Sequence, residues 1–196
     1  SANRHKAIDI YRSTNSSITN NSGATISSVG NTIRTGGTSG DPSTGYTITN
    51  SGKIFSTQTG NKSAVFFGNA NSSGGTITNN LGAEIYSGGT AATIKVGETT
   101  TITNRGSIKN NTSTSDNVIE LLGSNNTVTL EEGSILVGKI SSGSGTSGNT
   151  LKLNLGAGQG YFYETVGDFT LQDLDGNQVV KGSAGSVGQG GSETLD

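Results

Sequence analysis

Short runs of alternating apolar and polar residues recur along this chain, and their starts are separated by 30, 29, 25 and 26 residues. Each run reads Ile-Thr-Asn, then a glycine, then another isoleucine. Four clear copies and a weaker fifth occupy residues 18–26, 48–54, 77–85, 102–108 and 128–135. Period-two alternation is typical of a strand with one buried face, and the glycine between two runs marks a turn. A repeat of this length, built from strands and turns, predicts a solenoid.

A second alternating strand lies between successive copies of the first pattern. It occupies residues 7–10, 32–35, 64–67, 93–96, 117–121 and 150–153. Each coil therefore carries three short strands: this one, the Ile-Thr-Asn strand, and the strand that contains the isoleucine after the glycine. We predict an all-β fold, a parallel β-helix of about six coils, right-handed by default, whose successive strands pair about 4.8 Å apart.

Alternation also assigns faces in the second strand type. Its outward residues, in chain order, are Asp9, Arg34, Phe66, Lys95, Glu120 and Lys152. Stacking the coils in order places Asp9 beside Arg34, Lys95 beside Glu120, and Glu120 beside Lys152. Opposite charges on adjacent strands favour the correct register, so this order supports the alignment.

The corner after the Ile-Thr-Asn strand has two recurring residues. The asparagines that face inward there are Asn20, Asn50, Asn79 and Asn104. Stacked amides can hydrogen-bond from coil to coil, so we predict a structural asparagine ladder. The glycines that follow are Gly23, Gly52, Gly82 and Gly106. We expect each of them to supply a positive φ for the turn.

The pattern changes after residue 155. Residues 156–182 hold much of the aromatic content, and Asp175-Gly176 is a hairpin signal before the short strand at 178–180. We predict one β-helix domain over residues 1–182, with coils at 5–155 and a β-hairpin cap at 156–182 that covers the open strand edges. The Gly/Ser-rich residues 183–196 predict a flexible tail or linker.

Composition agrees with a thin, shared core. Only 29% of the 196 residues are hydrophobic and 5% aromatic, yet Pro occurs once and the net charge is −2, unlike most disordered chains. There is no Cys, which excludes disulfides and thiolate metal sites. With no long apolar run and no strongly basic region, we expect neither direct membrane insertion by this segment nor nucleic acid as a partner.

Candidate chemistry is sparse. The one histidine, His5, lies near the start of the chain, and the many serines lack a nucleophile elbow with acid and base partners. Residues 173–177 resemble a calcium loop, but the glycine is fourth and no glutamate follows at the twelfth place, so a turn is favoured. We predict that the chain is not an enzyme and has no cofactor or metal site.

The Ile-Thr-Asn-Ser-Gly-Lys-Ile phrase at 48–54, the polar bias and the aromatic segment after the last coil resemble the passenger domain of a bacterial autotransporter, over about residues 5–182. The resemblance implies export to the bacterial cell surface or secretion. It also implies that this chain is the C-terminal part of a passenger, acting as an adhesin or self-association stalk. The alternative is a scaffold and folding-nucleating end for an active part that lies upstream.

Two outward features are candidate contact surfaces. The large apolar residues expected outside the coils are Phe55, Phe66, Tyr86 and Leu136, and such a strip on a polar protein often binds a partner. Its partner would be a host surface protein, a glycan or another copy of the chain. The second feature is a pair of threonine rows, Thr47/Thr49, Thr76/Thr78, Thr101/Thr103 and Thr127/Thr129, extended by Ser17/Thr19. Threonine suits exposed strands, and an ice-binding face is a remote alternative.

Overall fold

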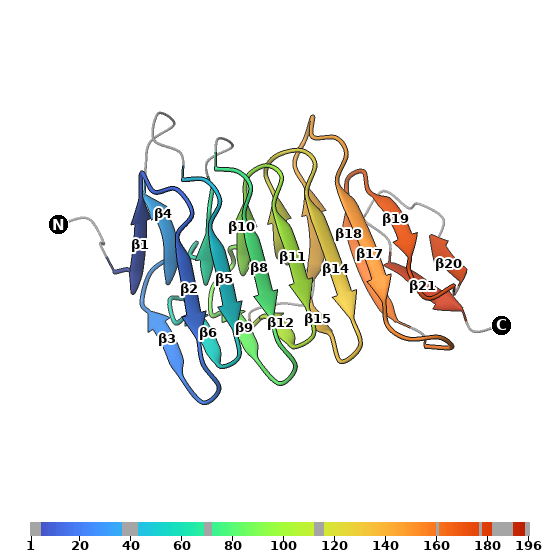
Figure 1. The fold of residues 1–196 in the computed structure, drawn as a ribbon, viewed down its shortest axis with the longest axis horizontal. Coiled ribbons are helices and arrows are strands. Elements are labelled where there is room, and N and C mark those ends of the chain that lie inside the picture. Colours follow the sequence, from blue (N-terminus) through green and yellow to red (C-terminus); the bar gives the residue numbers. More distant parts are fainter. Residues whose placement is uncertain are drawn as a thin grey trace.

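A computed structural model describes residues 5–36, 43–68, 72–111, 116–159, 161–176, 178–181 and 190–194. These residues form strands and turns, and three parallel sheets wind around one core as a stack of coils (Figure 1). The predicted all-β parallel β-helix with three strands per coil is confirmed. Its right-handedness stays a prediction. Within the described residues, no helix is long and apolar enough to cross a membrane.

Sheet 1 is the longest of the three sheets. Its parallel strands are β1 (Ile8–Tyr11), β4 (Ile33–Gly36), β7 (Val65–Phe66), β10 (Ile94–Val96), β13 (Asn117–Leu121), β16 (Lys139–Ser142) and β18 (Phe162–Val166). Two antiparallel strands follow at its C-terminal end, β21 (Gly190–Thr194) and then β20 (Gln178–Lys181).

Sheet 2 runs across the front of Figure 1, and sheet 3 lies below it in that view. Sheet 2 contains β2 (Ser17–Asn20), β5 (Thr47–Asn50), β8 (Thr76–Asn79), β11 (Thr101–Asn104), β14 (Thr127–Glu131), β17 (Thr150–Asn154) and β19 (Thr170–Asp173). Sheet 3 contains β3 (Thr25–Ser28), β6 (Lys53–Ser56), β9 (Glu84–Ser87), β12 (Ser107–Asn110) and β15 (Ile135–Val137).

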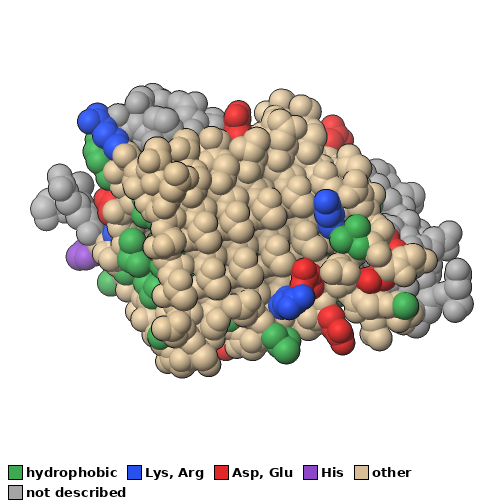
Figure 2. Space-filling model, viewed as in Figure 1, with side chains coloured by type: hydrophobic (Ala, Val, Ile, Leu, Met, Phe, Trp, Pro, Cys, Tyr) green, Lys and Arg blue, Asp and Glu red, His purple; other side chains and the backbone are tan. Residues whose placement is uncertain are grey.

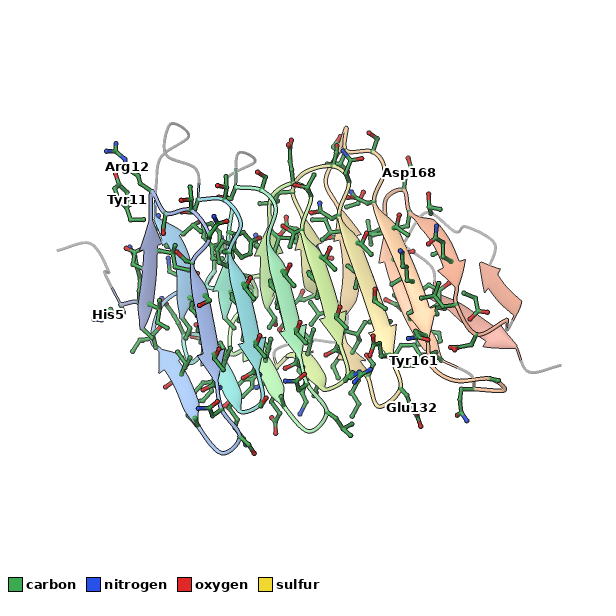
Figure 3. All side chains as sticks on the ribbon, viewed as in Figure 1. His5, Tyr11, Arg12, Glu132, Tyr161 and Asp168 are labelled. Carbon is green, nitrogen blue, oxygen red and sulfur yellow. The ribbon has the colours of Figure 1, made fainter. Side chains whose placement is uncertain are left out.

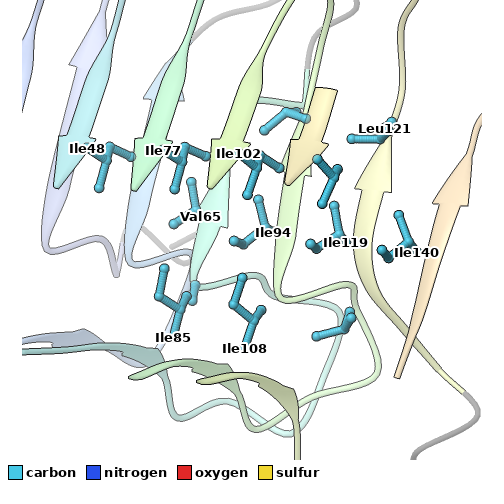
Figure 4. Close-up of a cluster of buried hydrophobic side chains, with 14 of the residues drawn as sticks. Ile48, Val65, Ile77, Ile85, Ile94, Ile102, Ile108, Ile119, Leu121 and Ile140 are labelled. Atoms are coloured by element: carbon cyan, nitrogen blue, oxygen red, sulfur yellow. The ribbon is translucent and has the colours of Figure 1, made fainter. Parts of the chain in front are cut away.

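The core is a stack of mainly aliphatic side chains contributed by the strands of the three parallel sheets (Figure 4). Ile48, Ile77 and Ile102 pair in register along sheet 2, and all three are fully buried. Ile94 and Ile119 do the same in sheet 1. Each such side chain contributes about 1.5–3 kcal/mol by burial, so a narrow core suffices when every coil repeats it.

The corner glycines have two different roles, which corrects the expectation of a positive φ at all four. Gly23 and Gly82 do have positive φ, 75° and 77°, whereas Gly52 and Gly106 do not. At Gly52 an added Cβ would lie 2.2 Å from the carbonyl oxygen of Ala24. The shorter corners therefore need glycine for close backbone packing against the preceding coil, and the longer corners need it for conformation.

The strand assignment fails at one place. Residues 150–154 form β17, which belongs to sheet 2, and Lys152 pairs with Thr129. The predicted pairing of Lys152 with Glu120 is therefore wrong. Strand β16 is the neighbour of β13 in sheet 1, and it places Ser141 beside Glu120. Alternation specifies which residues face inward, but it does not specify the sheet that a strand joins.

The other two charge pairings lie as expected. Asp9 pairs with Arg34 between β1 and β4. Lys95 pairs with Glu120 between β10 and β13, and the Lys95 Nζ lies 2.6 Å from the Glu120 carboxylate. Both partners are partly exposed, so their main effect is on register and less on stability.

The C-terminal end differs from the predicted hairpin. Gly176 lies in a turn with φ 80°, but in the described structure β19 pairs with β17, and β20 pairs with β21 instead. Strand β21 lies within residues 183–196, where we predicted a flexible tail, and it also pairs with β18. The rest of that segment, residues 183–189 and 195–196, lies outside the described residues. Sheet 1 gains an antiparallel cover for an edge that a parallel coil would otherwise leave open.

Candidate contact surface on the third sheet

The outer face of sheet 3 has two columns of side chains that repeat from coil to coil. One column is Thr25, Lys53, Glu84, Ser107 and Ile135. The other is Ser27, Phe55, Tyr86, Lys109 and Val137. The parallel register places equivalent positions of adjacent coils side by side, so the chemistry of each column follows directly from the sequence of successive repeats.

Phe55 and Tyr86 form a stacked aromatic pair on this face. Their ring centroids lie 4.6 Å apart, and the ring planes differ by 5°. Both side chains are partly exposed. Burial raises the pKa of the Tyr86 phenol, Lys53 opposes this shift, and Glu84 adds to it. The pair is therefore a partly desolvated apolar platform beside charged groups.

Three charged residues surround the platform. The Glu84 carboxylate lies 3.5 Å from the Lys53 Nζ and 3.6 Å from the Lys109 Nζ. These are the only charged residues in the five strands of sheet 3, which gives their face one net positive charge on a protein of net charge −2. Exposed ion pairs of this kind stabilise little, so the lysines stay available to a ligand.

Phe66 and Leu136 do not belong to this surface. Phe66 lies in β7 of sheet 1, where the Arg34 guanidinium is 5.9 Å from its ring centroid. Its ring covers Gly68, at which an added Cβ would lie 2.2 Å from the Phe66 Cζ. Phe66 therefore projects from a different sheet from that of Phe55 and Tyr86.

Leu136 faces the core, which corrects its assignment to the outer surface. It pairs with Ile108, a buried core residue, and packs against the core itself. Ile135, the residue expected inside, is 53% exposed. The inward residue of the fifth copy is Leu136, which follows Val128 by the same spacing that separates Ile77 from Ile85. Ile135 stands one position earlier, and a shift of one residue exchanges the two faces of a strand.

The four ladder asparagines lie at one inner corner and hydrogen-bond in series. The Nδ2 atoms of Asn20, Asn50 and Asn79 donate to the Oδ1 of the next asparagine at 2.7, 2.9 and 2.8 Å. Asn104 ends the series by donating to the Ser134 hydroxyl at 2.6 Å. Each of these asparagines is nearly or fully buried. The ladder satisfies polar groups and fixes register, and it presents nothing to a ligand.

A second buried polar row was missed by sequence reasoning. The row consists of residues that stand directly before a sheet 2 strand. In it, the Tyr46 hydroxyl hydrogen-bonds at 2.9 Å to the Thr100 hydroxyl, which lies two coils away. Tyr46 fills the space left by Gly75, where an added Cβ would lie 1.9 Å from its Cζ. Further along, the Thr100 and Asn126 backbone N–H groups donate to the side chains of Asn126 and Asn149. The available signal was that these residues, although they differ in type, all stand directly before a sheet 2 strand.

The threonine rows lie in register on the outer face of sheet 2. One row is Ser17, Thr47, Thr76, Thr101, Thr127, Thr150 and Thr170. The other is Thr19, Thr49, Thr78, Thr103 and Thr129, after which Lys152 and Gln172 interrupt it. Figure 2 shows this face, and the described residues at its centre carry neither charged nor hydrophobic side chains.

A groove with a volume of about 650 Å³ lies along the corners after the sheet 2 strands, near the C-terminal end. Its lining includes Leu81, Arg105, Glu131 and Asp175. Arg105 pairs with Glu131, and the Asp175 carboxylate accepts a hydrogen bond from the Gly156 N–H at 2.8 Å. Arg105, Glu131 and Asp175 are thus engaged within the protein.

Groups suited to acid–base or metal chemistry are not gathered in the part of the chain that the structure describes. No three His, Asp or Glu residues there lie close enough to hold a metal ion. His5 is exposed at the N-terminal end, while Glu132 lies toward the opposite end of the coil stack (Figure 3). Comparison with protein-family models, with curated proteins and with solved structures found no match.

Proposed function

We propose that this chain is a stiff stalk segment of a bacterial passenger protein, displayed on the cell surface or secreted, and that it takes part in adhesion or self-association. The observation that supports a contact role is the partly exposed Phe55–Tyr86 stack, in a chain that is only 5% aromatic. Aromatic residues with exposed ring area are over-represented at the centres of binding interfaces.

The stalk role is supported by the continuity of the coils. The first five coils pair through all three sheets, and the asparagine ladder runs without a break from Asn20 to Asn104. In such a stack the stabilising contacts are repeated from coil to coil along one axis, which suits an extended stalk.

The test is adhesion and autoaggregation by bacteria that display the full passenger, with Phe55→Ser and Tyr86→Ser combined. We expect both activities to fall, because the substitution removes the apolar platform and keeps the charges. The matched control is Phe66→Ser, which removes an outward aromatic from sheet 1. A double variant that is folded and displayed but adheres as well as the parent would overturn the proposal.

The alternative is that the segment serves as a scaffold and a folding-nucleating end for an active part elsewhere in the protein. The antiparallel strands β20 and β21, which close the end of sheet 1, favour this reading because a closed end gives stacking a place to start. Deleting the segment separates the two proposals. Lost display would support the scaffold role, and retained display without binding would support the adhesive role.

Ice binding by the threonine rows is a remote second candidate, favoured by their regular register over five coils. An ice-recrystallisation assay decides it. If the parent inhibits recrystallisation, Thr78→Tyr with Thr103→Tyr should abolish that activity by making the face uneven. Absence of activity in the parent would end this candidate.

A further inference from the structure

The aromatic stack on sheet 3 is open on one side. Beyond Tyr86 the column continues with Lys109, and beyond Phe55 it continues with Ser27, whose side chain is small and exposed. Ser27 cannot cover a phenyl ring, and no described ring stacks on this side of Phe55. The first coil therefore forms a step, with the Phe55 ring as its wall and the outer face of β3 as its floor.

The step has the size of one ring. Adjacent strands are about 4.8 Å apart, and stacked rings have centroid separations of about 4.5–7 Å. The 4.6 Å between Phe55 and Tyr86 shows that one coil spacing accommodates one ring. A ligand ring above Ser27 would thus continue the stack by one more layer.

The floor of the step carries hydroxyl groups. Ser27 and Thr25 both point outward from β3, and both are exposed. A hydroxyl donates one hydrogen bond and accepts others, so the two residues suit a ligand with hydroxyls around its rim. A sugar ring has that rim together with an apolar C–H face that packs on an aromatic ring. A purely aromatic ligand would leave these hydroxyls without partners.

The charge at the step favours an anion. Lys53 pairs with Thr25 across β3 and β6, and its side chain is 54% exposed. Its ammonium lies 3.5 Å from the Glu84 carboxylate on β9, so it has to turn back across β6 to meet a ligand above β3. Glu84 is shared between Lys53 and Lys109, which leaves one positive charge uncompensated on the face. A carboxylate on the ligand would gain a charge-assisted hydrogen bond from Lys53.

We propose that the step formed by Phe55, Ser27, Thr25 and Lys53 binds one pyranose ring that carries a carboxylate, as found in an acidic glycan. The ring stacks on Phe55, its hydroxyls reach Ser27 and Thr25, and its carboxylate reaches Lys53. This inference rests on the proposed adhesive function of sheet 3 and names the ligand class for that surface.

The experiment uses the whole chain and a hexasaccharide of alternating glucuronic acid and N-acetylglucosamine, with its carboxyl-reduced form as the uncharged probe. Binding is followed by NMR saturation transfer and by titration at low and high salt. We expect the acidic hexasaccharide to bind the parent at least about ten-fold more tightly than the reduced form, a difference that salt diminishes. Equal binding of the two forms by the parent would overturn the proposal.

Two variants locate the site. Ser27→Tyr fills the step with a ring of the protein's own, so it should abolish binding while it keeps Phe55, Tyr86 and the fold. Thr19→Tyr places the same ring on the outer face of sheet 2 in the same coil and should leave binding unchanged. Lys53→Gln should remove the preference for the acidic form. Full binding by folded Ser27→Tyr would overturn the proposal.

The same variants separate this inference from the proposed function. If displayed Ser27→Tyr adheres normally while the Phe55→Ser and Tyr86→Ser double variant does not, the acidic-glycan site is rejected and adhesion through sheet 3 stands. If the hexasaccharide binds as expected and the double variant still adheres, the glycan site stands and the adhesive proposal is rejected.

Discussion

The Asn79 Nδ2 donates a hydrogen bond of 2.8 Å to the Asn104 Oδ1 on the next coil, and it also reaches the Ser107 carbonyl oxygen at 3.2 Å. One amide thereby joins two coils and satisfies a strand-end carbonyl that lies away from water. Because the Asn79 Oδ1 also accepts from Asn50, removing this side chain leaves unpaired groups on both sides of it.

Asn79→Ala should therefore lower the free energy of unfolding by about 3 kcal/mol, the upper range for leaving buried polar groups unpaired. Urea denaturation followed by circular dichroism measures this loss. The matched control is Asn21→Ala at an exposed corner, which should change stability by less than about 0.5 kcal/mol. Equal effects at the two positions would contradict a stabilising role for the ladder.

The two kinds of corner glycine should respond differently to asparagine, a residue that tolerates positive φ. Gly82 has φ 77° and nothing within 4 Å of an added Cβ, so Gly82→Asn should cost about 1 kcal/mol or less. Gly52→Asn should cost several times more, because its Cβ would meet the Ala24 carbonyl oxygen at 2.2 Å. Thermal unfolding of the two variants gives the comparison, and similar losses would refute the distinction.

Buried Tyr46 should make stability depend on pH in the alkaline range. Burial raises the pKa of its phenol well above the ordinary tyrosine value of 10.0, and the hydrogen bond with Thr100 only partly opposes this shift. The folded state thus holds the proton more tightly than the unfolded state. This contribution is fully present below about pH 10 and is lost as the pH rises toward the folded-state pKa.

Tyr46→Phe isolates that contribution. At pH 8 the variant should be less stable than the parent by about 1 kcal/mol, the value of the lost hydrogen bond. At pH 11 the difference should shrink or change sign, since the phenylalanine has no proton to lose. Urea unfolding at both pH values checks this, and a constant difference would show that Tyr46 ionisation is not coupled to folding.

Tyr161 should protect the C-terminal edge of sheet 3. Burial raises the pKa of its phenol, while hydrogen bonds with the Ser134 side chain and the Leu136 backbone oppose the shift. Its hydroxyl thereby engages β15, the last strand of that sheet. Tyr161→Phe should expose a strand edge that then pairs between molecules. Sedimentation velocity should show concentration-dependent association, and a purely monomeric variant would argue against this protection.

Much of the fold was predictable because the repeats carry their own alignment. The isoleucines of the Ile-Thr-Asn phrase lie inside, and the Asn20–Asn104 corner positions coincide along the stack. The pairing of Lys95 with Glu120 was also visible, because both occupy the same place in successive repeats. In a repeat fold, paired strands occupy equivalent positions in successive repeats, so their partners can be found by aligning neighbouring repeats of the sequence.

The candidate surface was predictable only in part. Phe55 and Tyr86 were placed side by side by their repeat positions, but Leu136 was assigned to the wrong face because Ile135 was aligned with the inward isoleucines of the other copies. Phe66 lies in β7 of sheet 1, the strand type to which alternation had assigned it, so it is not part of the sheet 3 surface. The uncovered side of the Phe55 ring, above Ser27, could be recognised only from the structure. It depends on which coil lies next to Phe55 in space.

The sequence by itself determined the local alternation, the coil length and, except at Ile135 and Leu136, the residues of the repeated phrase that face the core, because these depend on a period of two and on simple repetition. The tertiary structure decided which sheet each strand joins, why each corner needs glycine, and how β20 and β21 close the end. Those outcomes depend on distances between chain segments, such as the 2.2 Å that separates a Cβ at Gly52 from Ala24, and no local pattern encodes them.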